Sequence, residues 1–205
     1  MNMQGQRVLV ADLMGEQMRA ITGSMVAYEG NLEFKSAGMG GGEGFMAGLK
    51  RKATGESLKL MNVTGQGRVY FAVDAQEITI IDLQNDTLAV ESSQLLAYHG
   101  NLRTDIKFSG LRGASTGQGL FTTTVTGMGQ VAVLSAGGPP IGLEVSPQFP
   151  LIVDPDAFIG YRGQLNQSFI TDITWRSAIG GGSGEMFSLR FDGQGVVYIQ
   201  PAERQ

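Results

Sequence analysis

The sequence contains one histidine, His99, which is the first residue to consider for chemistry. A histidine acts as a general base beside a nucleophile, or as a metal ligand beside further ligands. Ser92 and Ser93 lie close to it in the sequence, but they do not stand in the Gly-x-Ser-x-Gly pattern that presents a nucleophilic serine on a strand-to-helix turn. The sequence therefore predicts no Ser–His–Asp site.

Two carboxylates, Asp154 and Asp156, are separated by a proline and could form an acid pair or part of a calcium loop. A calcium loop places acidic or amide residues at alternating positions over about twelve residues and ends in a glutamate. Here the apolar segment 157–159 interrupts that pattern. Aspartate and proline together are typical of turns, so we predict a turn at this point.

The glycine-dense segment 36–48 invites comparison with a phosphate-binding loop. A Walker loop has the pattern Gly-x4-Gly-Lys-Ser/Thr, whose backbone N–H groups and lysine surround a phosphate, and the segment has no such run. Three Gly-x-Gly pairs elsewhere each lead into an apolar, strand-like stretch, where a dinucleotide fingerprint needs a helix. We interpret these pairs as tight turns between two strands. They are Gly65/Gly67, Gly127/Gly129 and Gly193/Gly195.

One basic run, Lys50-Arg51-Lys52, could contribute to a nucleic-acid surface with four other basic residues. Those four are Arg68, Arg103, Lys107 and Arg112. Aromatic side chains on which bases could stack are not interleaved with them. The chain has 15 basic and 19 acidic residues and a net charge of −4, whereas binding to a phosphate backbone needs a basic footprint. We therefore expect a solvated loop at 50–52 and no nucleic-acid partner; whether this run or the segment 36–48 has a function stays open.

One sequence pattern occurs three times in the chain, and His99 lies within it. The segments Met18–Leu32, Leu88–Leu102 and Leu151–Leu165 align without gaps. The alignment superposes Tyr28, Tyr98 and Tyr161, and two residues later Gly30, Gly100 and Gly163. We call each such segment a copy of the tyrosine motif. His99 has Glu29 and Arg162 as its counterparts, so the position accepts different polar groups, and we expect His99 to face outward.

Each copy of the tyrosine motif is preceded by an apolar strand and followed by a Gly-x-Gly segment. The preceding strands are 8–13, 78–83 and 141–145. The predicted fold is all-β, with three tandem homologous modules at about 7–72, 73–135 and 136–201 that pack into one compact pseudo-threefold unit. We expect the tyrosine rings to be buried and their hydroxyls to find a partner at a strand end. We also expect the N-terminal strand to lie beside the C-terminal strand 196–201, which would remove exposed sheet edges.

The composition agrees with a globular chain. Hydrophobic residues make up 42% of it and charged residues 17%, the latter below the usual share of about 25%. A surface with so little charge suggests coverage by a partner or by further copies of the chain. With no cysteine, disulfides and thiolate chemistry are excluded. The first residues do not resemble a signal peptide and no apolar run is long enough for a transmembrane helix, so we expect a cytoplasmic protein.

The ordered recurrence of Gly-Ser-Met-Val-Ala-Tyr (23–28), a glycine-rich loop, and Gly-Glu-Ser-Leu followed by Gly-x-Gly-x-Val (55–69) resembles the altered-inheritance-of-mitochondria family of the TRAP-like superfamily. The resemblance implies a β-sandwich, double-stranded-β-helix-like module related to subunits of the trp RNA-binding attenuation protein, and it is compatible with a homotrimer. Bacterial members of the family are mostly of unknown function, and mitochondrial relatives are linked to the organisation of inner-membrane complexes. The resemblance supplies no catalytic residue.

We therefore expect a non-enzymatic, self-associating scaffold or protein-interaction protein, which forms a homo-oligomer and binds a protein partner that the sequence does not name. One alternative is an RNA-binding protein related to the attenuation protein. Another is a protein that binds a small molecule or lipid in a β-lined cavity. We predict no catalytic, cofactor-binding or metal-binding residues.

Overall fold

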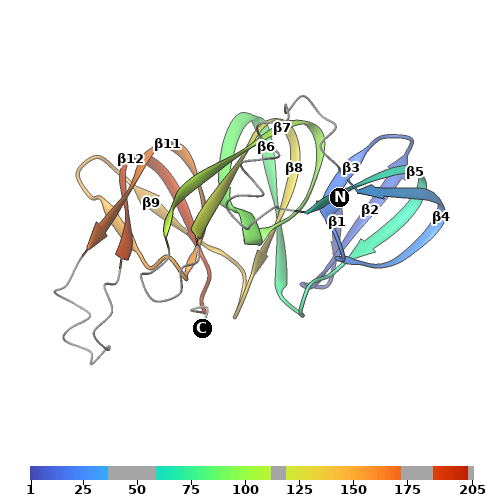
Figure 1. Ribbon diagram of the computed structural model, residues 1–205, viewed down its shortest axis with the longest axis horizontal. Coiled ribbons are helices and arrows are strands. Elements are labelled where there is room, and N and C mark those ends of the chain that lie inside the picture. Colours follow the sequence, from blue (N-terminus) through green and yellow to red (C-terminus); the bar gives the residue numbers. More distant parts are fainter. Residues whose placement is uncertain (37–58, 112–118, 172–186, 203–205) are drawn as a thin grey trace. The chain divides into compact units, whose positions relative to one another are not determined.

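The computed structural model describes residues 1–36, 59–111, 119–171 and 187–202, and its regular elements are strands apart from one short 3-10 turn, η1 (Ser92–Gln94) (Figure 1). The strands are β1 (Asn2–Gln4), β2 (Val8–Met14), β3 (Met18–Ile21), β4 (Met25–Ser36), β5 (Leu60–Phe71), β6 (Glu77–Glu91), β7 (Leu95–Leu111), β8 (Gly119–Ser135), β9 (Ile141–Val145), β10 (Leu151–Val153), β11 (Phe158–Thr171) and β12 (Phe187–Ile199). The prediction of an all-β fold is confirmed. The paired strands for which a register is recorded run antiparallel.

The described chain forms two compact units. Unit 1 contains Met1–Asn85, Ser93–Leu102 and Gly127–Leu134, and unit 2 contains Asp86–Ser92, Arg103–Thr126 and Ser135–Gln205. The long strands β6, β7 and β8 therefore contribute residues to both units.

Unit 1 is organised around β5. One edge of β5 pairs with β4 along most of its length, and the other edge pairs first with β3 and then with β2. Its side chains alternate, so that Met61, Val63, Val69 and Phe71 are buried, as expected of a strand with one face on a core. In Figure 1, β4 and β5 curve together as adjacent blue and teal ribbons.

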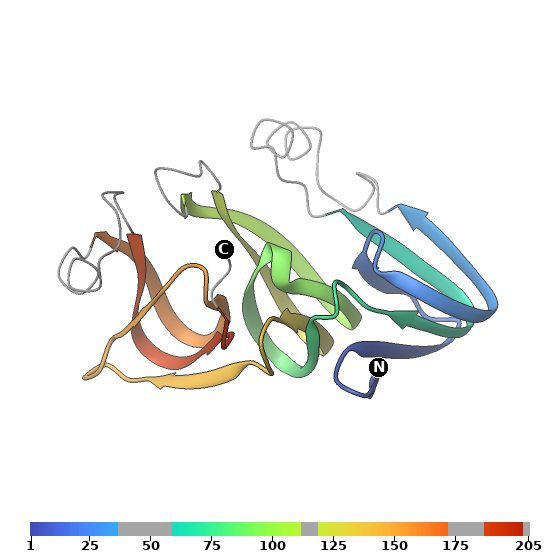
Figure 2. The same ribbon diagram turned by 90° about the horizontal axis from the view of Figure 1, so that it is seen from below.

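Unit 2 repeats this arrangement around β12. One edge of β12 pairs with β11, and the other pairs with β10 and then with β9. Leu189, Phe191 and Val197 of β12 are fully buried and pack with Phe158 and Val153. Figure 2 shows β11 and β12, in orange and red, bending together.

The Gly-x-Gly segments are not turns, so that prediction is wrong. They lie within the continuous strands β5, β8 and β12. In each case they pass the glycine of the tyrosine motif on a neighbouring strand: Gly67 is opposite Gly30, and Gly195 is opposite Gly163. A Cβ added at Gly65, Gly127 or Gly193 would overlap a backbone carbonyl oxygen of the facing strand. Glycine is needed here because two backbones approach closely and φ is positive, not because the chain reverses.

The expected pairing of the N-terminal strand with the strand 196–201 is also wrong. β2 pairs with β1 and β5. Residues 196–199 of β12 pair with β9 on one edge and with β11 on the other, so both of their edges are already hydrogen-bonded.

Candidate functional site

The residues that first suggested catalysis each have a recorded neighbour in the structure. His99 lies on β7 opposite Met18 of β3, and its Nε2 is 4.0 Å from Oε1 of Glu16. Ser92 is buried, and its hydroxyl shares a 2.8 Å hydrogen bond with the hydroxyl of Thr123. In the described part of the chain, no group of three or more His, Cys, Asp or Glu side chains is placed to hold a metal ion.

The aspartate pair forms the predicted turn. The backbone N–H of Asp156 donates to Oδ1 of Asp154 at 3.0 Å, and the N–H of Ala157 donates to the carbonyl oxygen of Asp154 at 3.0 Å. A side-chain oxygen that accepts from the backbone two residues later is the hydrogen bond by which aspartate stabilises a turn. These contacts form the turn between β10 and β11 and give the carboxylate of Asp154 a structural role.

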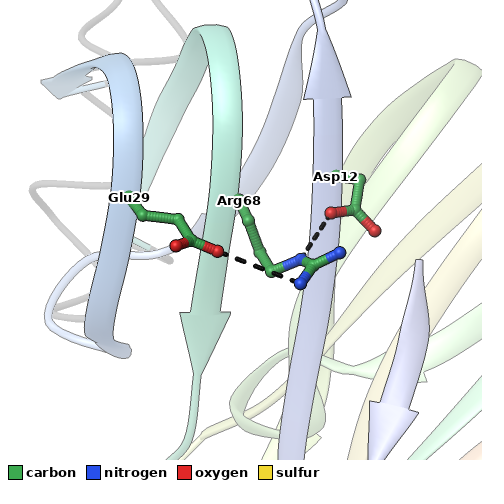
Figure 3. A network of polar contacts seen from close by, with 3 residues as sticks. All are labelled: Asp12, Glu29 and Arg68. Atoms are coloured by element: carbon green, nitrogen blue, oxygen red, sulfur yellow. Dashed lines mark hydrogen bonds and ion pairs between the residues drawn. The ribbon is translucent and has the colours of Figure 1, made fainter.

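The basic residues considered for nucleic-acid binding are only partly described. Lys50-Arg51-Lys52, the segment 37–48 and Arg112 lie outside the described residues. Arg68 is described, and its guanidinium lies between two carboxylates from neighbouring strands (Figure 3). Its Nε donates to Oδ1 of Asp12 at 2.6 Å, and its Nη1 is 3.9 Å from Oε1 of Glu29. The hydrogen bond to Asp12 raises the pKa of Arg68, so this cation is held by the protein's own acids.

Two strand pairings connect successive copies of the tyrosine motif. We call these pairings the first joint and the second joint. In the first joint, β3 pairs with β7, and Arg19 is opposite Tyr98. In the second joint, β6 pairs with β11, and Ala89 is opposite Tyr161. The motif alignment places Arg19 and Ala89 at the same position, so the two joints have the same register.

The first joint is held by apolar packing and by one arginine. Nη1 of Arg19 donates to the hydroxyl of Tyr98 at 3.1 Å, and its Nε donates to Oδ1 of Asn62 at 3.1 Å. The guanidinium carbon lies 6.0 Å from the centre of the Tyr98 ring, at the outer limit of a cation–π contact. Tyr98 is 4% exposed, as predicted for the tyrosine of the motif.

Glu16 adds an acidic group to the first joint. Its Oε2 accepts a 2.8 Å hydrogen bond from the backbone N–H of Met14. Hydrogen bonds from its own N–H and from that of Met14 lower the pKa of Glu16, and the nearby His99 lowers it further. The second joint has an acid, Asp86, at the position that corresponds to Glu16. Asp86 pairs with Arg162, which is the counterpart of His99.

The second joint surrounds its tyrosine with aromatic rings. The ring of Tyr161 lies 5.5 Å from that of Phe191 and 6.4 Å from that of Phe158. Burial raises the pKa of Tyr161. Because aromatic rings with centres 4.5–7 Å apart attract one another in tilted geometries, this cluster stabilises the N-terminal part of β11.

The first copy of the tyrosine motif, by contrast, is exposed. Tyr28 is 51% exposed and contacts Phe34 of its own strand, with the ring centres 5.1 Å apart. Val26 is 58% exposed. The prediction of a buried tyrosine is therefore wrong at this copy. The recorded pairing of β4 is with β5 alone, so no described strand covers Tyr28 as β3 covers Tyr98.

The short strand β10 is the second exposed edge. Among the described strands it pairs with β12 alone, and its central residue, Ile152, is 44% exposed. Phe149, just before it, is 77% exposed. The sequence analysis did not single out Val26, Phe149 or Ile152. The motif alignment identifies them only when it is combined with the strand pairing, because the counterparts of Val26 and Ile152 belong to the joints.

These features can be compared with known proteins. The family model described as mitochondrial biogenesis AIM24 matches residues 1–202. The chain belongs to this family. The resemblance to the altered-inheritance-of-mitochondria family is thus confirmed. No curated protein matches the chain.

Among solved structures, this AIM24-family chain is similar to a protein from Streptococcus pyogenes determined by X-ray crystallography. The two are 21% identical, the TM-score is 0.75, and the match covers 98% of this chain and 92% of the other. At this identity the similarity establishes the fold alone. No helix in the described part of the chain is long and apolar enough to span a membrane.

Proposed function

We propose that this chain is a non-enzymatic, self-associating protein-interaction module, built of three tandem modules at about 7–72, 73–135 and 136–201. The single observation that carries the proposal is the exposed apolar edge of β4. Val26 and Tyr28 are more than half exposed, whereas the residues at the same positions in the other two copies lie in the joints.

The three-module organisation is supported by the backbone register. Leu32, Gly30 and Tyr28 of β4 pair with Gly65, Gly67 and Val69. In the third copy, Leu165, Gly163 and Tyr161 of β11 pair with Gly193, Gly195 and Val197 in the same way. In the second copy, a Cβ on Gly100 would meet the Cα of Gly129, as a Cβ on Gly30 would meet that of Gly67. Such an agreement of register is expected of duplicated modules.

The physical basis for interaction is an unpaired strand edge. An edge strand presents a row of backbone N–H and C=O groups that can pair with another strand, and natural proteins usually protect such edges with charge or cover them. The far end of β4 is protected by the Glu33–Lys35 ion pair at 2.7 Å. The end that carries Val26 and Tyr28 presents apolar side chains instead, which favours contact with another protein surface.

Sedimentation or light scattering over a wide range of protein concentration tests this proposal. We expect the mass of the wild-type chain to rise above that of a monomer, and the double variant Val26→Lys/Tyr28→Lys to shift this rise to higher concentration. Met14→Lys is the matched control, because Met14 is 79% exposed on β2 and the substitution adds the same type of charge outside the edge. A wild-type chain that stays monomeric at every concentration would overturn the proposal.

No observation among the described residues favours the RNA-binding or the lipid-binding alternative. Two described basic residues near this edge already have acidic partners: Arg68 of β5 lies between Asp12 and Glu29, and Lys35 of β4 pairs with Glu33. The self-association proposal is therefore the one developed below.

A further inference from the structure

We propose that the β4 edge of one copy of the chain pairs with the β10 edge of a second copy, antiparallel and with Ile152 opposite Tyr28. This inference rests on the proposed self-association and names the two surfaces that meet. The contact is heterologous (head-to-tail), because the β4 edge of one copy meets the β10 edge of the other rather than a second β4 edge.

The first step of the argument is the register of the two joints. The residue opposite the tyrosine is Arg19 in the first joint and Ala89 in the second. The motif alignment places Ile152 at this same position in the third copy. In each joint this residue belongs to one copy and the tyrosine to the next. The third copy therefore has a residue that could lie opposite a tyrosine, Ile152, but no following copy to supply that tyrosine. The first copy has the tyrosine, Tyr28, but no preceding copy to supply the residue opposite it.

The second step is the burial of the tyrosine side of the joints. Val26 has Leu96 and Ile159 as its counterparts, and these are 0% and 1% exposed. Val26 and Ile159 also occupy the same backbone irregularity, since the register shifts between Met25 and Ala27 and between Phe158 and Gly160. The backbone is alike, so the missing neighbour accounts for the exposure of Val26.

The third step is the burial of the opposite side. Met18 and Ala20 are buried in the first joint, and Leu88, Ala89 and Val90 are buried in the second. In β10, Val153 is buried by its own core, whereas Ile152 is exposed at the unpaired edge. The β4 edge and the β10 edge thus both expose apolar side chains at positions that are buried in the first and second joints.

The side chains of the two edges suit each other. Ile152 opposite Tyr28 would be a β-branched residue facing an aromatic one, a favourable cross-strand pair. The first and second joints have an acid two residues before the short strand segment, Glu16 in one and Asp86 in the other; here that position is Phe149. The charge pairing of the internal joints is thereby replaced with exposed apolar surface. Glu29 already has Arg68 as its partner, so the contact requires no new counterion.

The occupant of each edge is a second copy of the chain. Tyr28 and Ile152 are both exposed in the single chain, and among the described strands neither β4 nor β10 is paired at this edge. Every copy carries one edge of each kind. Head-to-tail contacts of this type generate rings when the rotation between copies closes and filaments when it does not.

Disulfide trapping tests the register directly, because the chain contains no cysteine. Two full-length single variants, Tyr28→Cys and Ile152→Cys, are mixed under mild oxidation, with a size tag on one of them. Directly opposed residues on antiparallel strands have Cβ atoms about 4.5–5.5 Å apart, close to the spacing that a disulfide adopts. We expect a disulfide-linked dimer of the two different variants, in excess over either homodimer. Glu33→Cys mixed with Ile152→Cys is the off-register control and should give little product.

A complementary-charge experiment gives an independent measurement. Tyr28→Lys and Ile152→Glu should each weaken self-association by roughly tenfold or more, as expected when an apolar anchor in an interface is replaced. An equimolar mixture of the two variants should recover association, since the introduced ammonium group of one then faces the introduced carboxylate of the other. Circular dichroism and urea unfolding of each variant confirm that it is folded, which is expected because both positions are exposed.

The outcomes separate the two proposals. If the wild-type chain associates but neither the cysteine pair nor the charge pair behaves as described, the register is wrong and self-association stands. If the double variant Tyr28→Cys/Ile152→Cys forms its disulfide within one chain, the edges meet intramolecularly and the second-copy assignment is overturned. A wild-type chain that never associates removes both proposals.

Discussion

The first and second copies of the tyrosine motif share one close approach of two backbones and have different surroundings. Gly30 and Gly100 meet their facing glycines in the same geometry. Yet Tyr28 is 51% exposed, whereas Tyr98 is 4% exposed under Arg19 of β3. The difference teaches that the repeated sequence determines the local strand pairing, while the neighbouring copy determines which side chains are buried.

The largest loss of unfolding free energy is expected from substitution of the glycines at which two strands approach closely in every copy. Gly65→Ala, Gly127→Ala and Gly193→Ala each place a Cβ against a facing carbonyl oxygen at φ of +117°, +132° and +122°. Each should lower the free energy of unfolding by about 4 kcal/mol, in the range where backbone strain at a special φ is diagnostic. Urea unfolding measures this, with the same loss expected in all three copies.

Gly23→Ala is the control for the glycine series. Its φ is +91°, but no atom lies within 4 Å of an added Cβ. It should cost only about 1–2 kcal/mol, the penalty for a left-handed backbone alone. Equal losses at Gly23 and Gly127 would show that the close backbone approach is unimportant.

The two tyrosines should differ next. Tyr98→Ala should lower the free energy of unfolding by about 3–4 kcal/mol, as for other buried aromatic side chains that are truncated. Tyr28→Ala should cost about 0.5 kcal/mol, because exposed positions contribute little. Denaturant unfolding at concentrations where the chain is monomeric makes the comparison clean. A loss at Tyr28 as large as that at Tyr98 would mean that the first copy is covered within its own chain.

A smaller effect is expected when the two joints are made alike. Arg19→Ala gives the first joint the residue that Ala89 provides in the second. It removes two hydrogen bonds, to Tyr98 and to Asn62, and should cost about 1–2 kcal/mol, because each such bond has a net value of about 0.5–1.5 kcal/mol. An unchanged unfolding midpoint for Arg19→Ala would show that packing alone holds the first joint.

The smallest effect concerns pH. Backbone hydrogen bonds lower the pKa of Glu16 in the folded chain. A carboxyl group with a lowered folded-state pKa stabilises the fold above its unfolded pKa, and this contribution is lost as the pH falls through the folded pKa. The urea midpoint of the wild type should therefore exceed that of Glu16→Gln at neutral pH, and the difference should vanish in acid. A difference that grows on acidification would contradict the prediction.

The sequence was sufficient for the strand framework. The stretch 141–145 was predicted as a strand and is β9, and the predicted strands 8–13 and 78–83 lie within β2 and β6. The period-2 alternation and the β-branched residues carry this information locally. The Asp154–Asp156 turn was also predictable, because aspartate stabilises turns through contacts within a few residues.

The sequence was not sufficient where distant strands decide the outcome. Gly65 and Gly67 were assigned to a turn because positive φ is commonest there. Their real reason is the backbone of β4, which lies opposite them. Likewise, three aligned tyrosines gave no means to predict that Tyr28 is exposed, since its burial would require a strand that only the later copies receive.

The two exposed edges are unequal, since β4 presents Tyr28, the tyrosine side of a joint, and β10 presents Ile152, the residue that would lie opposite a tyrosine. An assembly built through them has polarity, with a different surface at each terminus. A fragment that retains only the β4 edge could join such an assembly but could not extend it. If the head-to-tail contacts generate a filament, such fragments would act as chain terminators and their supply would set the filament length.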